Sequence, residues 1–337
     1  MDLNSCLPPV SEIKLRPWKQ SYGADYYGAL RVASDYCGLA DIPHHFPGMW
    51  QHGAWPPWML LRPEIAVYDA PKSTRCFVER QDEVEFLKTG GYSKVEAIGL
   101  PIVYTQPSGL QRIPNSLLIM PTHSLDSDAI SPSTERYVSE ISSIVNRFSL
   151  VAAGVSAYCL DKGLWAPEFE KHGIQVVRGA AIGDGNALKR MRSLFDIFEY
   201  MTTDRYGSHV FYALYFGVKV SIWGTATPLF RQNVLTDGGW TAYPDAVDEL
   251  LSEQTERKAE RYLGPLRVDP WNGKQDIALG QSMLGHESKL RPEEMRRCFG
   301  WTPAGIMADK VLEASRRSIF WRGGAAMKRR LLKTSKS

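Results

Sequence analysis

The chain has 337 residues, of which 44% are hydrophobic and 23% are charged, and its formal net charge is +3 at pH 7. This length predicts about two domains, and the composition is that of an ordinary globular protein with a sizeable core. No apolar run approaches the roughly 18 residues of a membrane span, and no basic region followed by an apolar stretch opens the chain. The sequence therefore argues against a membrane-spanning protein and against a secretory signal peptide.

The first half of the chain predicts short strand–helix steps. A helix is expected over residues 24–37, because its apolar side chains fall on one face. Residues 43–58 are rich in Pro, Gly and Trp, which predicts a loop. Strands are then expected over residues 75–79 and 95–99, on either side of a helix over residues 82–89. This order of strand, helix and strand favours a parallel sheet.

The second half alternates strand and helix about four times, which is typical of a Rossmann-like half. Strands are predicted over residues 116–120, 150–158, 174–178 and 219–223, and helices over residues 137–148, 167–172 and 187–200. We therefore expect an N-terminal Rossmann-like domain of residues 1–115 and a C-terminal one of residues 116–305. A basic tail of residues 306–337 follows them.

Residues 201–223 carry the most informative pattern: a strand end, a polar turn, a short apolar helix, a glycine stop and a second strand. Thr203, Gly207, Ser208 and His209 fall in the turn, where the helix begins. A helix N-terminus exposes unpaired N–H groups and the positive end of the helix dipole, so it favours an anion. We expect this turn to hold the phosphate of a nucleotide-activated donor.

A second loop of hydroxyl and histidine side chains follows the strand over residues 116–120. It contains Thr122, His123 and Ser124. Ligands of open α/β sheets bind at the carboxyl ends of the strands. In one doubly wound sheet this loop and the turn of residues 202–209 would open on the same edge, around one phosphate. A structural histidine, bonded within its own loop, is the alternative for His123.

His52 is the candidate catalytic residue of the N-terminal half. It precedes a glycine, so a substrate can approach it closely, and an ordinary pKa of about 6.5 suits a general base for a hydroxyl nucleophile. A structural histidine is one alternative. A metal site with His44 and His45 is another, although no carboxylate is well placed to complete it. A cleft carboxylate such as Glu79 is the second candidate for the base.

Residues 183–186 form a glycine-rich segment that opens a helix. A cradle for a diphosphate is one interpretation, but the segment lacks the spacing of a dinucleotide or P-loop fingerprint. A helix N-cap built by Asp184 or Asn186 is the favoured interpretation. Asp126 and Asp128 form a weak DxD pattern for a metal–nucleotide complex, with a helix cap as the alternative.

The cysteines point to a reduced compartment. The five of them are widely scattered and none forms a CxxC pair: Cys6, Cys37, Cys76, Cys159 and Cys298. This pattern argues against a disulfide framework and a zinc site, and it fits a cytoplasmic protein.

The positive charge of the chain is concentrated at its C-terminal end. Eight basic residues and no acidic one follow Glu313, and the rest of the chain carries a net charge of about −5. Basic and aromatic side chains together suit an anionic membrane surface. A solvated tail is the alternative, and the acidic body argues against a nucleic-acid partner.

Four short motifs follow one another in a set order. They are His52-Gly53, residues 95–101, residues 118–124, and residues 203–208 with the helix, glycine and strand that come next. This order resembles the GT-B-fold glycosyltransferases of bacterial surface polysaccharides, above all the capsule and lipopolysaccharide group that includes Kdo and sialic-acid transferases. The CDP-glycerol glycerophosphotransferases of teichoic acid synthesis are similar in layout. The resemblance spans about residues 50–225.

The resemblance implies an α/β, GT-B-like fold, in which two Rossmann-like domains face each other across a cleft and the C-terminal one holds most of the donor. It implies that His123 and Ser208 contact the nucleotide phosphate and that His52 lies near the acceptor. The chain departs from the glycerophosphotransferases in two places: Gly207 stands where a serine is usual, and Ala54-Trp55 stands where Thr-Pro is expected. These departures favour a sugar donor.

We therefore expect a metal-independent glycosyltransferase. It would transfer a sugar from a nucleotide-sugar donor, for example a CMP-linked one, to a glycan or glycolipid acceptor of a capsule or lipopolysaccharide O-antigen. No cofactor is expected besides this co-substrate. The protein would be cytoplasmic and peripheral on the inner face of the plasma membrane. Two alternatives stay open: a UDP-sugar 2-epimerase of the same fold, and a non-catalytic binding protein of polysaccharide assembly.

Overall fold

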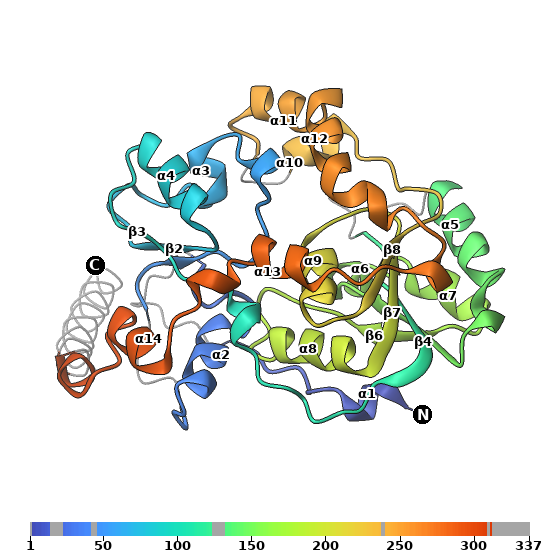
Figure 1. The fold of residues 1–337 in the computed structure, drawn as a ribbon, viewed down its shortest axis with the longest axis horizontal. Coiled ribbons are helices and arrows are strands. Elements are labelled where there is room, and N and C mark those ends of the chain that lie inside the picture. The colour runs from blue at the N-terminus through green and yellow to red at the C-terminus, as the bar shows by residue number, and fades with distance from the viewer. Residues whose placement is uncertain are drawn as a thin grey trace, which may run out of the picture.

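The computed structural model describes residues 2–13, 23–41, 46–122, 132–236, 240–308 and 311. Within them the strands form two parallel sheets, a smaller one on the left of Figure 1 and a larger one on the right. The chain is therefore an α/β protein of Rossmann-like character, as predicted. No helix of the described residues is long and apolar enough to cross a bilayer.

Both sheets are parallel throughout. The smaller has the order β1-β2-β3, with β1 (Met49–Trp50), β2 (Cys76–Val78) and β3 (Val95–Ala97). The larger has the order β6-β5-β4-β7-β8, with β4 (Ile113–Ile119), β5 (Leu150–Val155), β6 (Gln175–Arg178), β7 (Phe198–Thr203) and β8 (Lys219–Ile222). This is the doubly wound order, in which the strand sequence reverses between β4 and β7.

Helices connect the strands and cover the sheets (Figure 1). Those up to β7 are α1 (Leu3–Cys6), α2 (Ala29–Tyr36), α3 (Pro63–Ala66), α4 (Gln81–Thr89), α5 (Pro132–Ser142), α6 (Ala157–Asp161), α7 (Ala166–Lys171) and α8 (Ala187–Ile197). The later ones are α9 (Ser208–Tyr215), α10 (Arg231–Thr236), α11 (Pro244–Leu250), α12 (Glu253–Leu263), α13 (Ile277–Met283) and α14 (Pro292–Cys298). Short 3-10 turns join several of them.

The two faces of the larger sheet pack against different helices. Leu118 and Ala152 belong to the core cluster that contains the apolar residues of α8 and α9. Leu117 and Ala153 belong to the cluster of α5 and α7. Successive side chains of a strand point to opposite faces, so each strand feeds both clusters. Burial on both faces explains why these strands are apolar without alternation.

Three predicted helices differ from the structure, and the one expected over residues 137–148 spans Pro132–Ser142 instead. The helix expected over residues 24–37 begins only at Ala29, because Tyr27 (φ 58°) and Gly28 (φ 80°) take left-handed backbone conformations. A right-handed helix cannot include such residues. The helix expected over residues 187–200 ends at Ile197. The next residues form β7 instead, because they pair with β4 on one side and β8 on the other.

Each end of the described chain packs on elements far from it in sequence. Leu3 and Leu7 are buried in the same core cluster as α8. The segment after α13 returns to the smaller sheet, where the Phe299 ring contacts the rings of Phe46 and Phe77. These returns join the two sheets into one core cluster. The domain boundaries predicted at residues 115 and 305 stay predictions.

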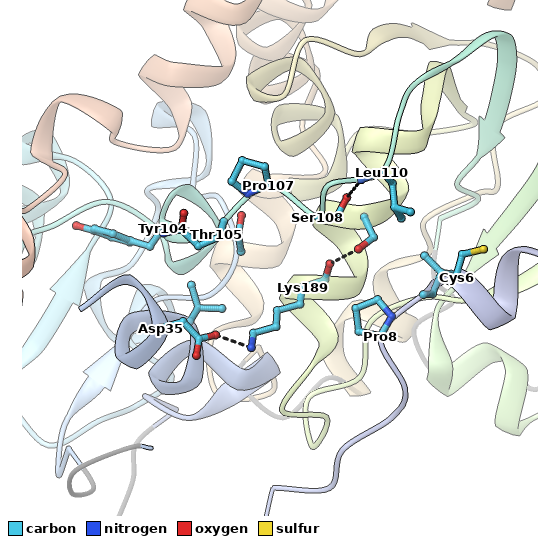
Figure 2. Close-up of a pocket in the computed structure, with 13 residues that line it drawn as sticks. Cys6, Pro8, Asp35, Tyr104, Thr105, Pro107, Ser108, Leu110 and Lys189 are labelled. Carbon is cyan, nitrogen blue, oxygen red and sulfur yellow. Dashed lines mark hydrogen bonds and ion pairs between the residues drawn. The ribbon is translucent and has the colours of Figure 1, made fainter. Parts of the chain in front are cut away.

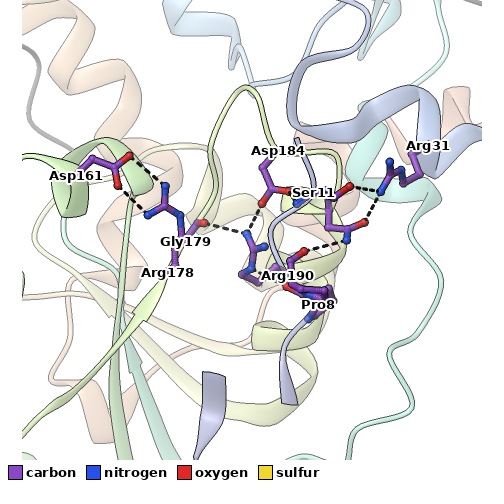
Figure 3. Close-up of polar contacts among 10 residues, drawn as sticks. Pro8, Ser11, Arg31, Asp161, Arg178, Gly179, Asp184 and Arg190 are labelled. Atoms are coloured by element: carbon purple, nitrogen blue, oxygen red, sulfur yellow. Dashed lines mark hydrogen bonds and ion pairs between the residues drawn. The ribbon is translucent and has the colours of Figure 1, made fainter. Parts of the chain in front are cut away.

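A buried ion pair fixes the N-terminal segment to the loop after β6 (Figure 3). Asp184 and Arg190 lie 2.6 Å apart, and their side chains are 2% and 3% exposed. The Asp184 carboxylate also accepts the N–H groups of Ser11 and Asn186, each at 2.9 Å, while Arg190 donates to the carbonyl of Gly179. Asn186, one of the two predicted candidates, is the N-cap of α8, but its side chain makes no capping bond and instead bonds to Arg31 and to the carbonyl of Pro9. Asp184 holds the N-terminal segment.

The Arg190→Leu variant is expected to lose about 3–5 kcal/mol of unfolding free energy, because it leaves the Asp184 carboxylate buried and unpaired. Denaturant unfolding measures this loss. The double variant Asp184→Asn with Arg190→Leu should recover part of it, since the buried charge is then gone.

The matched control is Arg257→Leu. Arg257 pairs with Glu253 at 2.9 Å, but both side chains are at least 80% exposed. A surface pair of this kind contributes less than about 1 kcal/mol. Equal losses in the Arg190 and Arg257 variants would contradict the stabilising role of the buried pair.

Candidate functional site

A cavity of about 320 Å³ lies at the carboxyl edge of the larger sheet. Residues after four neighbouring strands line it: 120–122 after β4, Ser156 after β5, 179–180 after β6 and 206–209 after β7. It therefore occupies the reversal point of the doubly wound sheet, where ligands of such sheets bind. The predicted residues Thr122, Gly207, Ser208 and His209 all belong to its lining.

The wall opposite these strand ends comes from the N-terminal half. Tyr27, His52 and Gly53 line the same cavity. His52 follows β1 of the smaller sheet, so the cavity collects residues from the carboxyl ends of both sheets. The structure thus brings the predicted catalytic histidine and the predicted phosphate turn to one place.

Hydrogen bonds join α9 directly to the His52 loop. The Ser208 hydroxyl, at the first position of α9, accepts the N–H of Ala54 at 2.9 Å. One turn later, the Tyr212 hydroxyl donates to the carbonyl oxygen of His52 at 2.7 Å. The oxygen of Ser208 is therefore directed at the opposite loop. We call these two bonds the α9 clasp.

Asp204 holds the loops of β4 and β7 together. Its buried carboxylate accepts the N–H of Thr122 at 2.8 Å through Oδ1 and the N–H of Thr227 at 3.0 Å through Oδ2. The prediction that the two loops open on one sheet edge is confirmed by this contact. Asp204 is not among the site residues predicted from the sequence. The sequence signal that could have pointed to Asp204 is its position directly after a buried strand, among hydroxyl residues.

Thr203 orients His209 and does not line the cavity. Thr203 is fully buried at the end of β7, and its hydroxyl donates to the carbonyl of Arg205 at 2.7 Å. With its proton used, the Thr203 oxygen can only accept from His209 Nε2, 3.0 Å away. Thr203 therefore acts on the cavity through the His209 ring.

His52 is enclosed by aromatic rings. The Tyr68 ring stacks on it at 4.8 Å and 11°, and the rings of Tyr26 and Tyr27 each lie 5.1 Å away. The Tyr68 hydroxyl is 3.3 Å from Nε2, while Nδ1 is buried without a partner in the part of the chain that the structure describes. Burial lowers the pKa of His52 from 6.5 to about 4, so the imidazole is neutral at pH 7.

Glu79, the second predicted base, is enclosed by its own chain and does not line the cavity. Its carboxylate forms an ion pair with Arg80 and accepts the N–H of Trp55 at 3.0 Å. Arg80 also lies 3.2 Å from the buried Glu83. Burial raises the pKa of both carboxyl groups, and the neighbouring Glu79 raises that of Glu83 further. These partners fix the loop after β1, and the role of Glu79 as a base stays a prediction.

Several predicted features lie outside the described residues. These are His123 and Ser124 of the β4 loop, His44 and His45, the DxD pattern at Asp126 and Asp128, and the basic residues after Glu313. Among the described residues, no three His, Cys, Asp or Glu side chains gather in a way that could hold a metal ion.

A second cavity, of about 490 Å³, lies away from the strand ends (Figure 2). Residues of α2, α8 and the segment 104–110 line it. Its two charged side chains, Lys189 and Asp35, form an ion pair with each other. The cavity of about 490 Å³ does not lie at the position where doubly wound sheets bind ligands. The cavity of about 320 Å³ is therefore the stronger candidate.

No protein-family model and no curated protein matches this chain. Two solved structures are similar to it in part. The pneumococcal O-GlcNAc transferase GtfA, in complex with UDP and GlcNAc, is 14% identical with a TM-score of 0.30, over 66% of this chain and 44% of that one. The accessory secretory protein 1, 2 and 3 of Streptococcus pneumoniae is 11% identical with a TM-score of 0.25, over 62% and 46%. The chain thus spans less than half of either structure, and these low scores carry no conclusion about its activity.

The depressed pKa of His52 predicts a loss of stability in acid. Between about pH 6.5 and pH 4, the unfolded chain binds a proton at His52 that the folded chain does not bind. The contribution of His52 to the unfolding free energy is therefore complete above pH 6.5 and falls as the pH drops towards 4. Denaturant unfolding at several pH values measures it.

The matched variant for this experiment is His52→Gln, which cannot titrate. Other groups, including Glu79 and Glu83, titrate in both proteins, so the difference between the two stability curves isolates His52. We expect the wild type to lose more stability than the variant below pH 6.5. Parallel curves down to pH 4 would contradict the buried, neutral state of the ring.

Proposed function

We propose that this chain is a glycosyltransferase that binds a nucleotide-sugar donor in the cavity at the carboxyl edge of the larger sheet. The observation that carries the proposal is that the N-terminus of α9 and the neutral His52 line one cavity. An anionic group suits the helix N-terminus. His52 comes from the loop after a strand of the smaller sheet. A ligand that reacts at a bond next to its phosphate would contact both the N-terminus of α9 and His52.

The rest of the lining suits a nucleotide with a ring and polar atoms. Gly154 adds no side-chain bulk to this wall of the cavity, which leaves room for a ring close to the strand ends. The Thr122 hydroxyl is buried and has no partner among the described residues, so it is available to a polar ligand atom. Apolar side chains of α8, Leu188 and Met191, complete this side.

The backbone at the start of α9 is the proposed phosphate site. Ser208 already accepts the N–H of Ala54, so the first N–H groups of the helix, rather than this hydroxyl oxygen, would hold the phosphate. Gly207 and His209 flank them. In the proposed reaction the bond between the sugar carbon and the phosphate oxygen breaks, an acceptor hydroxyl forms the new glycosidic bond, and the neutral His52 takes the proton of that hydroxyl. The helix N-terminus stabilises the charge left on the phosphate.

The acceptor and the setting rest on the sequence resemblance. On that basis the acceptor is a glycan or glycolipid of a bacterial surface polysaccharide, and the basic tail brings the protein to the inner face of the membrane. His123 and Ser124, which belong to this proposal, follow Thr122 directly in the chain.

The proposal predicts stabilisation by nucleotides. Melting temperatures with CMP, CDP, UDP and GDP should show an increase of a few degrees for at least one of them, because a ligand at about 100 times its Kd adds about 2.7 kcal/mol. An unchanged melting temperature with all four nucleotides would contradict a nucleotide site. Consumption of a sugar nucleotide without an acceptor would instead favour the epimerase.

The location of the site is tested by Gly154→Leu. Gly154 lines the cavity, and a Cβ there makes ordinary van der Waals contact with Leu118 and Met120, so a leucine side chain would take up space at this wall. This variant should lose the nucleotide-dependent stabilisation while it still unfolds cooperatively. The matched control is Gly183→Leu, because Gly183 is exposed with nothing within 4 Å of a Cβ. Equal nucleotide responses in the two variants would place the ligand elsewhere.

A further inference from the structure

Residues 240–250 include α11 and lie outside both sheets, at the top of Figure 1. We call them the strap. We propose that the strap holds the turn of Tyr68 and Asp69 in place, so that the Tyr68 ring keeps one face of His52 covered. Tyr243, the N-cap of α11, is the positioning residue. The contacts that support this proposal lie within the chain, so it does not depend on the identity of the ligand.

The turn of Tyr68 and Asp69 has a strained backbone. It follows α3 directly, and its φ angles are 53° at Tyr68 and 54° at Asp69. A helix often ends on one left-handed residue, usually a glycine. Here two consecutive residues with side chains are left-handed. Asp tolerates this conformation, but for a residue as bulky as Tyr it persists only where the surroundings impose it.

Tyr68 covers His52 from this turn. Its ring stacks on the imidazole, with centroids 4.8 Å apart and an angle of 11° between the planes, so it lies over one face of the ring. Burial disfavours the charged imidazolium and lowers the pKa of His52 to about 4. An open turn would expose this face to water, and the pKa of His52 would then rise towards 6.5.

Other titratable and charged groups surround His52. Tyr26 and Tyr27 place their rings 5.1 Å from it, His209 lines the same cavity, and Tyr212 donates to its carbonyl oxygen. The buried Glu79, Arg80 and Glu83 follow the neighbouring strand β2. Substitutions in the strap leave all of these groups unchanged. A change in the pKa of His52 in such a variant therefore reports the covering of the ring.

The strap holds the turn through Tyr243. The Tyr243 hydroxyl donates to the carboxylate of Asp69 at 2.8 Å. Asp69 is the residue next to Tyr68, so this bond fixes the backbone on which the covering ring stands. Ala246 of α11 adds an apolar contact, because it is buried in the same core cluster as Ile65, Ala66 and Val67 of the segment before the turn.

Two further contacts of the strap reach the segments on either side of His52. Asp245 forms an ion pair with Arg62, the N-cap of α3. The Trp240 ring stacks on Trp55 at 6.1 Å and 19°, and Trp55 lies three residues after His52 in the same loop. The strap therefore contacts both the loop that carries His52 and the segment that carries its cover.

The turn is held by a small margin. The side chains of Arg62 and Asp245 are 48% and 60% exposed, and exposed ion pairs add little stability. The left-handed backbone of the turn opposes these contacts. Loss of one contact should therefore open the turn in a measurable fraction of the molecules.

The role of Tyr243 is tested by NMR titration of the histidine ring signals in the full chain, with His52→Gln to assign the signal of His52. The wild type should give a pKa of about 4 for His52. Tyr243→Phe keeps the ring but removes the bond to Asp69, and it should raise this pKa by about half a pH unit or more, the equivalent of one hydrogen bond. A variant that is less stable in denaturant but keeps the wild-type pKa of His52 would overturn the proposal.

Two substitutions at Asp69 separate the shape of the turn from its charge. Asp69→Asn keeps an acceptor oxygen and a side chain that tolerates the left-handed backbone, so the pKa of His52 should not rise. Asp69→Val removes the acceptor and brings a β-branched side chain that rarely takes this conformation, so the pKa should rise more than in Tyr243→Phe. Loss of the negative charge alone would lower the pKa in both variants. Equal pKa values in the two would refute the role of the turn.

The matched control for Tyr243→Phe is Tyr262→Phe. The Tyr262 ring lies on α12, outside the strap, and stacks on Trp58 at 5.0 Å. This variant should leave the pKa of His52 unchanged. An equal rise in both variants, or a wild-type pKa near 6.5, would contradict the proposal. No nucleotide enters these measurements, so their outcome is independent of the proposed function.

Discussion

The α9 clasp is the interaction on which the rest of the site depends. Ser208 and Tyr212 lie one turn apart on α9, and they bond to the backbone of Ala54 and His52. The carboxyl ends of two separate sheets thereby face each other at a fixed distance, with the cavity between them. One core cluster already joins the two sheets, and these bonds fix the His52 loop against the N-terminus of α9.

Buried charged groups fix each loop that the clasp brings together. Asp204 holds the loops after β4 and β7, the Asp184–Arg190 pair holds the loop after β6, and Glu79 with Arg80 holds the loop after β1. Every one of these groups lies at or just beyond a strand end. Burial of charge is costly unless geometry and partners are good. In this structure the buried charged groups lie where loops near the cavity have to be held in position.

Much of the fold could be predicted from the sequence, because the pattern of apolar residues reports burial directly. The strands over residues 116–120 and 219–223 and the helix over residues 82–89 are all present, as β4, β8 and α4. The errors have a common cause. Residues 198–200 continue a helical pattern, but pairing with β4 makes them a strand. The helix expected from residue 24 begins only at Ala29, after the left-handed backbone of Tyr27, whose ring contacts His52. In both, tertiary contacts outweigh local preference.

The sequence by itself determined the alternation of strands and helices and the choice of His52 as a candidate site residue. It also determined that four further candidates lie at strand ends: Thr122, Gly207, Ser208 and His209. Only the tertiary structure decided what these side chains do. It enclosed Glu79 in an ion pair, directed the Ser208 oxygen at Ala54, and stacked Tyr68 on His52. The physical reason is that hydrogen-bond partners and burial come from residues far apart in the chain, such as 52 and 212. Spacing along the sequence carries no record of them.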